Sequence, residues 1–437
     1  MKRLFTLSVL AFMAFLPCVA QGYAKAIEQD PARTAGTFYV YDSNALPVLT
    51  AVPDGYKPVY ISHFGRHGAR YCTSEYENLH SWLSKAAGAG ALTDAGKEFY
   101  ERYEAYYGKV RYCKGNLSTI GKQQHRQIAG RMYERFPDVF DGPTHVQAVS
   151  TESPRVIMSM WSFLSALQAK DADIEFDADA SAKYASWLQP TLKTNPYLVA
   201  GAFDVGKPAE KAFREYFDRT VPWKEIASRF FTDAGVLRSL LNITPTRFID
   251  VLHGVVSSTY CLSEDRGCFD DVFSKEELTC VWKGLSAKYF MDIARFEGSG
   301  NLILDYAAFT LDQIIESAGA DLASGSTQLR LRFGHDSGIA PLMVLLDADG
   351  CGRATSSFEE SLEIFPSYNN PMGSSVQFVF YRNASGDTLV KVLVNEREVT
   401  LPLEPVKGPN YRWGDFKAYY GRIVSASKAK IAALAGN

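Results

Sequence analysis

Three apolar runs rich in β-branched residues each end abruptly in a cluster of polar side chains. The runs span residues 59–61, 146–149 and 329–333, and the clusters are Arg66-His67, Ser150 to Arg155, and His335-Asp336. A helix-like pattern follows each cluster, with apolar residues at helical spacing over 156–168 as an example. Strand, polar loop and helix in this order predict an α/β fold. Because ligands bind at the carboxyl ends of strands in such sheets, we expect the three clusters to meet in one pocket.

The 437 residues are enough for one large domain with an insertion, or for two domains. Between residues 169 and 296, amphipathic helical stretches such as 207–231 and 275–296 alternate with loops containing Pro and Gly. We therefore predict a mostly helical cap over residues 169–296, inserted into a discontinuous α/β core of residues 27–168 and 297–437. Two alternating runs, 376–381 and 389–394, predict a hairpin at the edge of the sheet.

The N-terminal residues have the pattern of a targeting segment. Lys2 and Arg3 precede an apolar run over 4–17, and Cys18-Val19-Ala20 follows as a small-residue cleavage site. The run is too short to span a bilayer comfortably, so residues 1–20 are predicted to be a cleaved signal peptide. A lipid anchor through Cys18 is the alternative, but Pro17 stands where a small residue is expected. We expect an exported protein (periplasmic, at the cell surface or secreted) with no transmembrane segment.

After removal of residues 1–20 the chain carries 44 basic and 49 acidic residues, a formal charge of −5. A mildly acidic protein is a poor candidate for nucleic-acid binding, which depends on neutralising phosphates. Any anionic ligand must therefore be held by a local group of basic side chains. The expected partner is a small-molecule phosphate ester, and the sequence leaves the oligomeric state open.

Six cysteines remain after processing, and in an exported chain they permit disulfide bonds. Cys261 and Cys268 flank a polar loop, while Cys72 and Cys113 lie near the arginine-rich segment, so both pairs are candidates. Buried free thiols are the alternative. The sequence contains no Cys-x-x-Cys and no His-Glu-x-x-His motif, so we predict no metal site and no cofactor.

The segment Arg66-His67-Gly68-Ala69-Arg70 places one histidine between two arginines. Guanidinium groups pair well with phosphate oxygens, and a neutral imidazole is a nucleophile near neutral pH. These residue types predict phosphoryl transfer through a phosphohistidine. Taken alone, five residues are equally consistent with a solvated basic turn. The presence of the two other polar clusters favours an active site.

These motifs resemble those of the histidine acid phosphatase family, which includes phytases and belongs to the phosphoglycerate-mutase-like superfamily. The family pattern Arg-His-Gly-x-Arg matches Arg66 to Arg70, a later strand-end arginine matches Arg155, and a His-Asp pair matches His335-Asp336. The resemblance covers most of the mature chain and is vague only in the cap. It implies a phosphoglycerate-mutase-like sheet core flanked by helices.

The resemblance also implies the role of each site residue. His67 is the nucleophile, Asp336 is the general acid, and the phosphate is clamped by four side chains, namely Arg66, Arg70, Arg155 and His335. Gly68 would let the backbone approach the phosphate. Each assignment has a structural alternative: Arg155 can be a salt-bridge partner near a helix N-terminus, and Asp336 can cap a helix. The histidines outside the motifs are expected to be structural or at the surface; they are His63, His80, His125, His145 and His253.

A narrower resemblance is to the multiple inositol polyphosphate phosphatases. Tyr71 follows Arg70 as is usual there, and residues 392–396, ahead of 401–403, are also similar. One feature departs: that branch usually has His-Ala-Glu where this chain has His335-Asp336-Ser337, which puts the substrate and the site of attack in doubt. Lysines of the expected cap either contact a polyphosphorylated ring or form a solvated face; they are Lys170, Lys183, Lys193, Lys207 and Lys211.

The sequence therefore predicts an exported phosphomonoesterase that acts through a phosphohistidine on inositol polyphosphates of the phytate type. Two alternatives within the same chemistry are a general acid phosphatase acting on sugar or aryl phosphates and a phosphosugar mutase. The mutase is disfavoured by the signal segment and by the long helical insertion. A non-catalytic protein that binds phosphorylated ligands is the third alternative, disfavoured because nucleophile, clamp and acid are all present.

Overall fold

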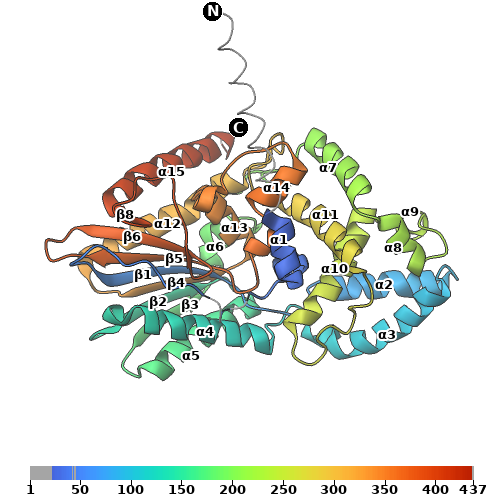
Figure 1. Cartoon of the computed structure of the whole chain (residues 1–437), viewed down its shortest axis with the longest axis horizontal. Helices are drawn as coiled ribbons and strands as arrows, with labels where there is room; N and C mark the ends of the chain where they lie inside the picture. The colour runs from blue at the N-terminus through green and yellow to red at the C-terminus, as the bar shows by residue number, and fades with distance from the viewer. Residues whose placement is uncertain (1–21, 42, 44–45, 436–437) are drawn as a thin grey trace, which may run out of the picture.

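The computed structural model describes residues 22–41, 43 and 46–435, and the predicted signal peptide lies outside these residues. An eight-stranded mixed sheet forms the centre of the protein, in the order β3-β2-β4-β1-β5-β6-β7 with β8 beside β6 (Figure 1). Strands β3, β2, β4 and β1 are parallel, and the others are antiparallel. Their bounds are β1 Lys57–Arg66, β2 His145–Ser150, β3 Glu175–Ala180, β4 Leu329–Gly334, β5 Ser375–Arg382, β6 Thr388–Val394, β7 Arg397–Glu398 and β8 Asn410–Arg412.

The predicted strands are present. The three apolar runs lie in β1, β2 and β4, and the predicted hairpin is the pair β5–β6. The central strands are largely buried on both faces, and the two arginines that interrupt the apolar pattern of β4, Arg330 and Arg332, bond to side chains of α12. Strand β3 was not predicted, because its sequence Glu-Phe-Asp-Ala-Asp-Ala has no β-branched residue and its position at the sheet edge leaves it half exposed.

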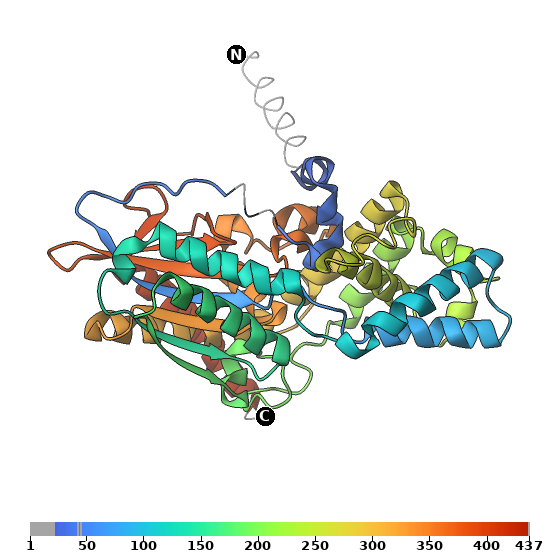
Figure 2. The same cartoon turned by 90° about the horizontal axis from the view of Figure 1, so that it is seen from below.

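Helices cover both faces of the sheet. Figures 1 and 2 show α4 (Thr119–Arg135) and α5 (Pro154–Lys170) side by side on one face. The opposite face is covered by α12 (Ile303–Ser324), α13 (Asp336–Leu345) and α15 (Trp413–Ala435). This arrangement confirms the predicted fold class, a sheet core flanked by helices.

A helical lobe lies beyond the carboxyl ends of the parallel strands (Figure 1). It contains α7 (Lys207–Thr220), α8 (Trp223–Phe230), α9 (Val236–Ser239), α10 (Pro245–Ser258) and α11 (Lys275–Ile293). Two helices from the segment after β1 also belong to it: α2 (Glu75–Gly88) packs against α10, and α3 (Asp94–Val110) packs against α8. The sequence did not indicate this packing, and the division into core and cap domains stays a prediction.

The six cysteines of the described chain are free thiols, and neither suggested disulfide is present. Two of them, Cys72 and Cys261, are buried and direct their Sγ atoms to the carbonyl oxygens of Gly254 (3.4 Å) and Phe38 (3.5 Å). These contacts orient each thiol toward backbone rather than toward its suggested partner. In the part of the chain that the structure describes, no helix has the length and apolar character needed to span a membrane.

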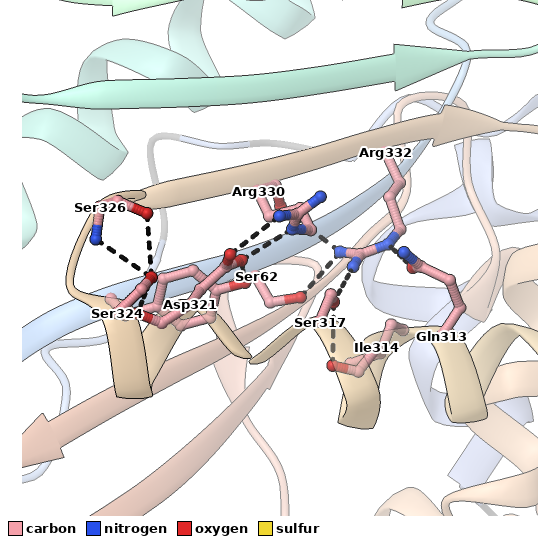
Figure 3. A network of polar contacts seen from close by, with 10 residues as sticks. Ser62, Gln313, Ile314, Ser317, Asp321, Ser324, Ser326, Arg330 and Arg332 are labelled. Carbon is pink, nitrogen blue, oxygen red and sulfur yellow. Dashed lines mark hydrogen bonds and ion pairs between the residues drawn. The ribbon is translucent and has the colours of Figure 1, made fainter. Parts of the chain in front are cut away.

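A buried polar network joins β4 to β1 and α12 (Figure 3). Arg330 donates two hydrogen bonds to Asp321 (2.7 and 2.8 Å), and the hydroxyl of Tyr60 donates a third at 2.8 Å. Arg332 is fully buried, and burial lowers its pKa to about 10. Its guanidinium donates to three neutral side-chain acceptors, Gln313 (2.5 Å), Ser317 (2.7 Å) and Ser62 (2.8 Å). The network fixes β4, whose end carries His335-Asp336, against β1, whose end carries Arg66-His67.

We predict that Asp321→Asn lowers the free energy of unfolding by about 3 kcal/mol, because it removes a buried carboxylate and leaves the partly buried Arg330 guanidinium without its partner. Urea unfolding followed by circular dichroism measures the change. The matched control is Asp94→Asn, which breaks an exposed ion pair with Lys97 and is expected to have no measurable effect. Equal effects of the two substitutions would contradict the structural role of the network.

Candidate active site

Backbone hydrogen bonds hold two of the predicted clusters together. The amide of Arg66 donates to the carbonyl of Ser374 (2.8 Å), and the amide of His67 donates to the carbonyl of Gly334 (3.0 Å). Gly334 is the last residue of β4 and directly precedes His335, so the ends of β1 and β4 lie next to each other. The rings of His67 and His335 are 5.7 Å apart, edge to face. The parallel pairing of the two strands therefore brings both motifs to one edge of the sheet.

Two glycines bring the loop after β1 against the N-terminus of α4. A Cβ on Gly68 would lie 2.5 Å from the carbonyl oxygen of Gly121, and a Cβ on Gly121 would overlap the backbone of Ala69. Ser118, the N-cap of α4, also donates to the carbonyl of Ala69 (3.0 Å). The structure thus gives a different reason for Gly68 from the predicted one: the crowding atoms belong to α4.

The imidazole of His67 is buried, and its Nδ1 lies 3.0 Å from the carbonyl oxygen of Gly68. A carbonyl can only accept a hydrogen bond, so Nδ1 carries the proton and Nε2 is left with a free lone pair. Burial, followed by the charge of Arg66, holds the pKa of His67 well below its usual range. The ring is therefore neutral, with Nε2 available as a nucleophile.

Arg66 is fixed on one side by backbone and on the other by a carboxylate. Its Nη1 donates to the carbonyls of Thr37 (2.8 Å) and Asn370 (2.7 Å), and its Nη2 lies 3.5 Å from Oδ2 of Asp336. Only 1% of the side chain is exposed, and burial lowers its pKa despite the opposing charge of Asp336. A buried guanidinium with a single, longer ion pair retains strong affinity for an anion.

Arg155 and His335 form a second pair on the far side of the site. Pro154 begins α5, and Nη2 of Arg155 lies 3.3 Å from Nδ1 of His335. Because a guanidinium only donates, Nδ1 accepts, and Nε2 of His335 donates to Oγ1 of Thr151 at 3.1 Å. Burial, followed by the charge of Arg155, lowers the pKa of His335 to about 3. Among the described residues Arg155 has no carboxylate partner within ion-pair distance, so its structural alternative finds no support.

Asp336 begins α13 and points its carboxylate toward Arg66. Its Oδ1 accepts a hydrogen bond from the amide of Ser337 (3.0 Å), so it also serves the helix N-terminus. Burial raises the pKa of Asp336, but the charges of Arg66 and Arg70 outweigh burial and lower it overall. Its side chain is 40% exposed, far more than that of Arg66, which leaves it accessible to a ligand.

Arg70 completes the group. Its Nη1 donates to the carbonyl of Tyr71 (2.9 Å), and its guanidinium lies over the ring of Phe38, 5.2 Å from the centroid. The charge of Arg70 contributes to the lowered pKa values of His67, Arg155 and Asp336. The structure therefore brings together all six predicted residues around Nε2 of His67.

Two cavities flank this group. One, of about 340 Å³, lies beside Arg155 and His335 and is lined by hydroxyl and amide groups, among them Thr151, Ser153, Ser181 and Gln189. The other, of about 270 Å³, lies between the helical lobe and the core and is lined by Glu75, Asp250, Lys288, Tyr289 and Asp292. The sequence did not identify either set as the lining of a cavity. Thr151 and Ser153 had a signal, because they lie in the strand-end cluster that contains Arg155.

The histidines outside the motifs do not belong to the group of six predicted residues, although His253 lines the cavity on the helical-lobe side. His63, His125 and His253 are buried, and His80 is bonded to Glu104 at 2.7 Å. Burial lowers the pKa of His63 to about 3 and that of His125 and His253 to about 4, so all three are neutral. These observations agree with structural roles.

We predict that Gly68→Ala lowers both stability and activity, because the added methyl group would lie 2.5 Å from the Gly121 carbonyl and displace the His67 loop. Thermal unfolding and phosphate release measure the two effects. The matched control is Gly108→Ala in α3, where a Cβ meets no atom within 4 Å and should leave activity unchanged. Unaltered activity in Gly68→Ala would contradict the close approach of the loop to α4.

Comparison with known families identifies part of this chain directly. Residues 64–197, which contain His67 and Arg155, match the Histidine phosphatase superfamily (branch 2). A search of curated proteins gives no match.

Solved structures with the same fold extend the likeness over most of the chain. The multiple inositol polyphosphate phosphatase of Bifidobacterium longum in complex with inositol hexasulfate is 18% identical, with a TM-score of 0.72 over 88% of this chain and 97% of that one. A phytase from D. castellii is 15% identical, with a TM-score of 0.65 over 90% and 84%. The Hafnia alvei phytase in complex with tartrate is 12% identical, with a TM-score of 0.56 over 86% and 98%.

At these identities the structures show a shared fold, which confirms the predicted phosphoglycerate-mutase-like core. The family match agrees with the predicted class of enzyme, a phosphoric monoester hydrolase. Residues 64–197 are thus similar to the Histidine phosphatase superfamily (branch 2), in agreement with the resemblance carried by the motifs of this segment.

Proposed function

We propose that this protein hydrolyses phosphomonoesters through a phosphoryl group carried on Nε2 of His67. The contact between Nδ1 of His67 and the Gly68 carbonyl supports this proposal most directly, because it leaves Nε2 unprotonated inside a group of arginines. No other described histidine combines a free lone pair with a neighbouring cluster of guanidinium groups. A non-catalytic phosphate-binding site would not need this tautomer.

In the first step the phosphate oxygens of the substrate are held by Arg66, Arg70 and Arg155. His335, predicted as a fourth clamp residue, instead orients Arg155, because its Nδ1 accepts from Arg155 and its Nε2–H donates to Thr151. Nε2 of His67 attacks the phosphorus, the bond from phosphorus to the ester oxygen breaks, and the leaving oxygen takes the proton of Asp336. The fixed arginines stabilise the charge that builds on the transferring group. In the second step water attacks the phosphohistidine, Asp336 takes a proton from that water, and phosphate and neutral His67 are released.

Asp336 must be protonated before it can donate, although the surrounding cations lower its pKa in the ligand-free site. A bound phosphate ester brings negative charge between the same cations and the carboxylate. That charge offsets the charges of Arg66 and Arg70, so substrate binding raises the pKa of Asp336. This coupling makes the proton donor ready only when the substrate is present.

The proposed substrates are inositol polyphosphates. Support comes from the shared fold of a phosphatase solved with inositol hexasulfate and of two phytases. A general acid phosphatase acting on sugar or aryl phosphates is the second candidate, favoured by the carboxylates that line one of the two cavities. Export is part of the proposal because residues 1–20 have the pattern of a signal peptide.

We predict that His67→Ala abolishes phosphate release and that Asp336→Asn lowers kcat on an alkyl phosphate by about 10²- to 10⁴-fold. With 4-nitrophenyl phosphate, whose leaving group needs no proton, Asp336→Asn should give a burst of nitrophenol and then accumulate phosphoenzyme. Stopped-flow absorbance and intact mass measure these steps. His80→Ala, a surface substitution, is the activity control. Full activity of His67→Ala, or equal losses of Asp336→Asn on both substrates, would contradict the assigned roles.

The rate is also predicted to depend on pH in one direction. As pH falls, Asp336 gains the proton that it must donate, whereas His67 stays neutral because its pKa lies well below the usual range. We therefore expect kcat/KM to rise from neutral pH toward acid pH, with the optimum on the acid side. Asp336→Asn should flatten this profile when an alkyl phosphate is the substrate. An alkaline optimum would be incompatible with Asp336 as the donor.

A further inference from the structure

The cavity on the helical-lobe side has a charge opposite to that of the phosphate clamp. Its wall is built by η1 (Pro31–Phe38), α2, α10 and α11. Three carboxylates line it, Glu75, Asp250 and Asp292, against one ammonium group, Lys288. A site that had to hold several additional phosphates would need more cationic than anionic side chains.

This cavity begins directly beside the reacting groups. Thr37 lines it, and the Thr37 carbonyl accepts a hydrogen bond from Arg66 at 2.8 Å. Tyr289 also lines it, and its hydroxyl accepts a hydrogen bond at 2.7 Å from Asn370, whose carbonyl holds Arg66. Burial, followed by the charge of Asp336, raises the pKa of Tyr289. Groups of the substrate next to the leaving oxygen therefore face this cavity when Asp336 donates its proton.

Ion pairs inside the cavity leave one carboxylate uncompensated. Lys288 pairs with Asp292 (2.5 Å), and Arg247 pairs with Asp250 (2.9 Å). Glu75 instead accepts hydrogen bonds from the amide and hydroxyl of Thr73 at 2.8 and 2.9 Å, both neutral donors. Burial lowers the pKa of Arg155, and the negative charge of Glu75 partly offsets this lowering. Glu75 therefore acts on the phosphate clamp as well as lining the cavity.

The cavity offers a second phosphate few cationic groups. Of the described lysines only Lys288 lines this cavity. Three of the cap lysines considered from the sequence are instead in surface ion pairs; they are Lys170 with Glu134, Lys183 with Asp179, and Lys211 with Glu215.

We propose that this cavity selects substrates with free hydroxyl groups beside the reacting phosphate, so that partly phosphorylated polyols are preferred to fully phosphorylated rings. The inference rests on the proposed phosphatase function and names its substrate class. A hydroxyl group can donate to Glu75, whereas a second phosphate is repelled by this carboxylate, which has no cationic partner within ion-pair distance among the described residues. The hydroxyl-lined cavity beside Thr151 has one acidic lining residue, Glu152.

The test compares kcat/KM for an inositol trisphosphate with free hydroxyl groups and for inositol hexakisphosphate at one ionic strength. The native protein should prefer the trisphosphate by at least tenfold. Glu75→Gln and Asp250→Asn should each shift the ratio toward hexakisphosphate by at least fivefold, and added salt should reduce the shift. Glu98→Gln, an exposed substitution on α3, is the matched control and should leave the ratio unchanged.

Calorimetric binding of both ligands to His67→Ala, alone and combined with Glu75→Gln, gives the same comparison without turnover. Tighter binding of hexakisphosphate to the double variant than to His67→Ala supports the inference. This holds even if the native protein releases no phosphate, a result that would count only against the proposed phosphatase function. A native preference for hexakisphosphate, or a ratio and affinities unaffected by Glu75→Gln and Asp250→Asn, would overturn the inference. Circular dichroism confirms that each variant is folded.

Discussion

The hydrogen bond from Nδ1 of His67 to the Gly68 carbonyl is the contact on which the account of the site depends. It fixes the tautomer, and thereby determines which nitrogen meets the substrate. The contact in turn requires the backbone after β1 to follow one path, which is held by the β4 end through Gly334 and by α4 through the facing glycines Gly68 and Gly121. A nucleophile made in this way depends on the fold and not only on the motif.

Electrostatics divide the site into two halves with different tasks. Around Nε2, buried arginines lower the pKa of His67 and provide a place for a phosphate group. On the leaving-group side, carboxylates from α2, α10 and α11 face the same position. Asp336 lies between the two halves, paired with Arg66, so its protonation responds to the charge of whatever binds. In the proposed function, separate elements would recognise the reacting phosphate and select the rest of the substrate.

Much of the core could be predicted because its strands are buried and end in unusual chemistry. Strands β1, β2 and β4 read as apolar runs, and His67, Arg155 and His335 follow their ends. The edge strand β3 has no such pattern, and the packing of α2 against α10 depends on contacts between segments far apart in the sequence. For the same reason Glu75 and Asp250 could not be recognised, since acidic residues on separate amphipathic helices look like solvated faces until the fold brings them together.

The most direct measurement is the position of phosphate attachment in the trapped intermediate. Asp336→Asn is mixed with 4-nitrophenyl phosphate, quenched at alkaline pH to preserve phosphohistidine, and examined by ³¹P and ¹⁵N nuclear magnetic resonance together with peptide mass spectrometry. The account predicts a single phosphorylated residue, His67, with the phosphorus bonded to Nε2 because Nδ1 is engaged by Gly68. Attachment at Nδ1, or at any other residue, would contradict it.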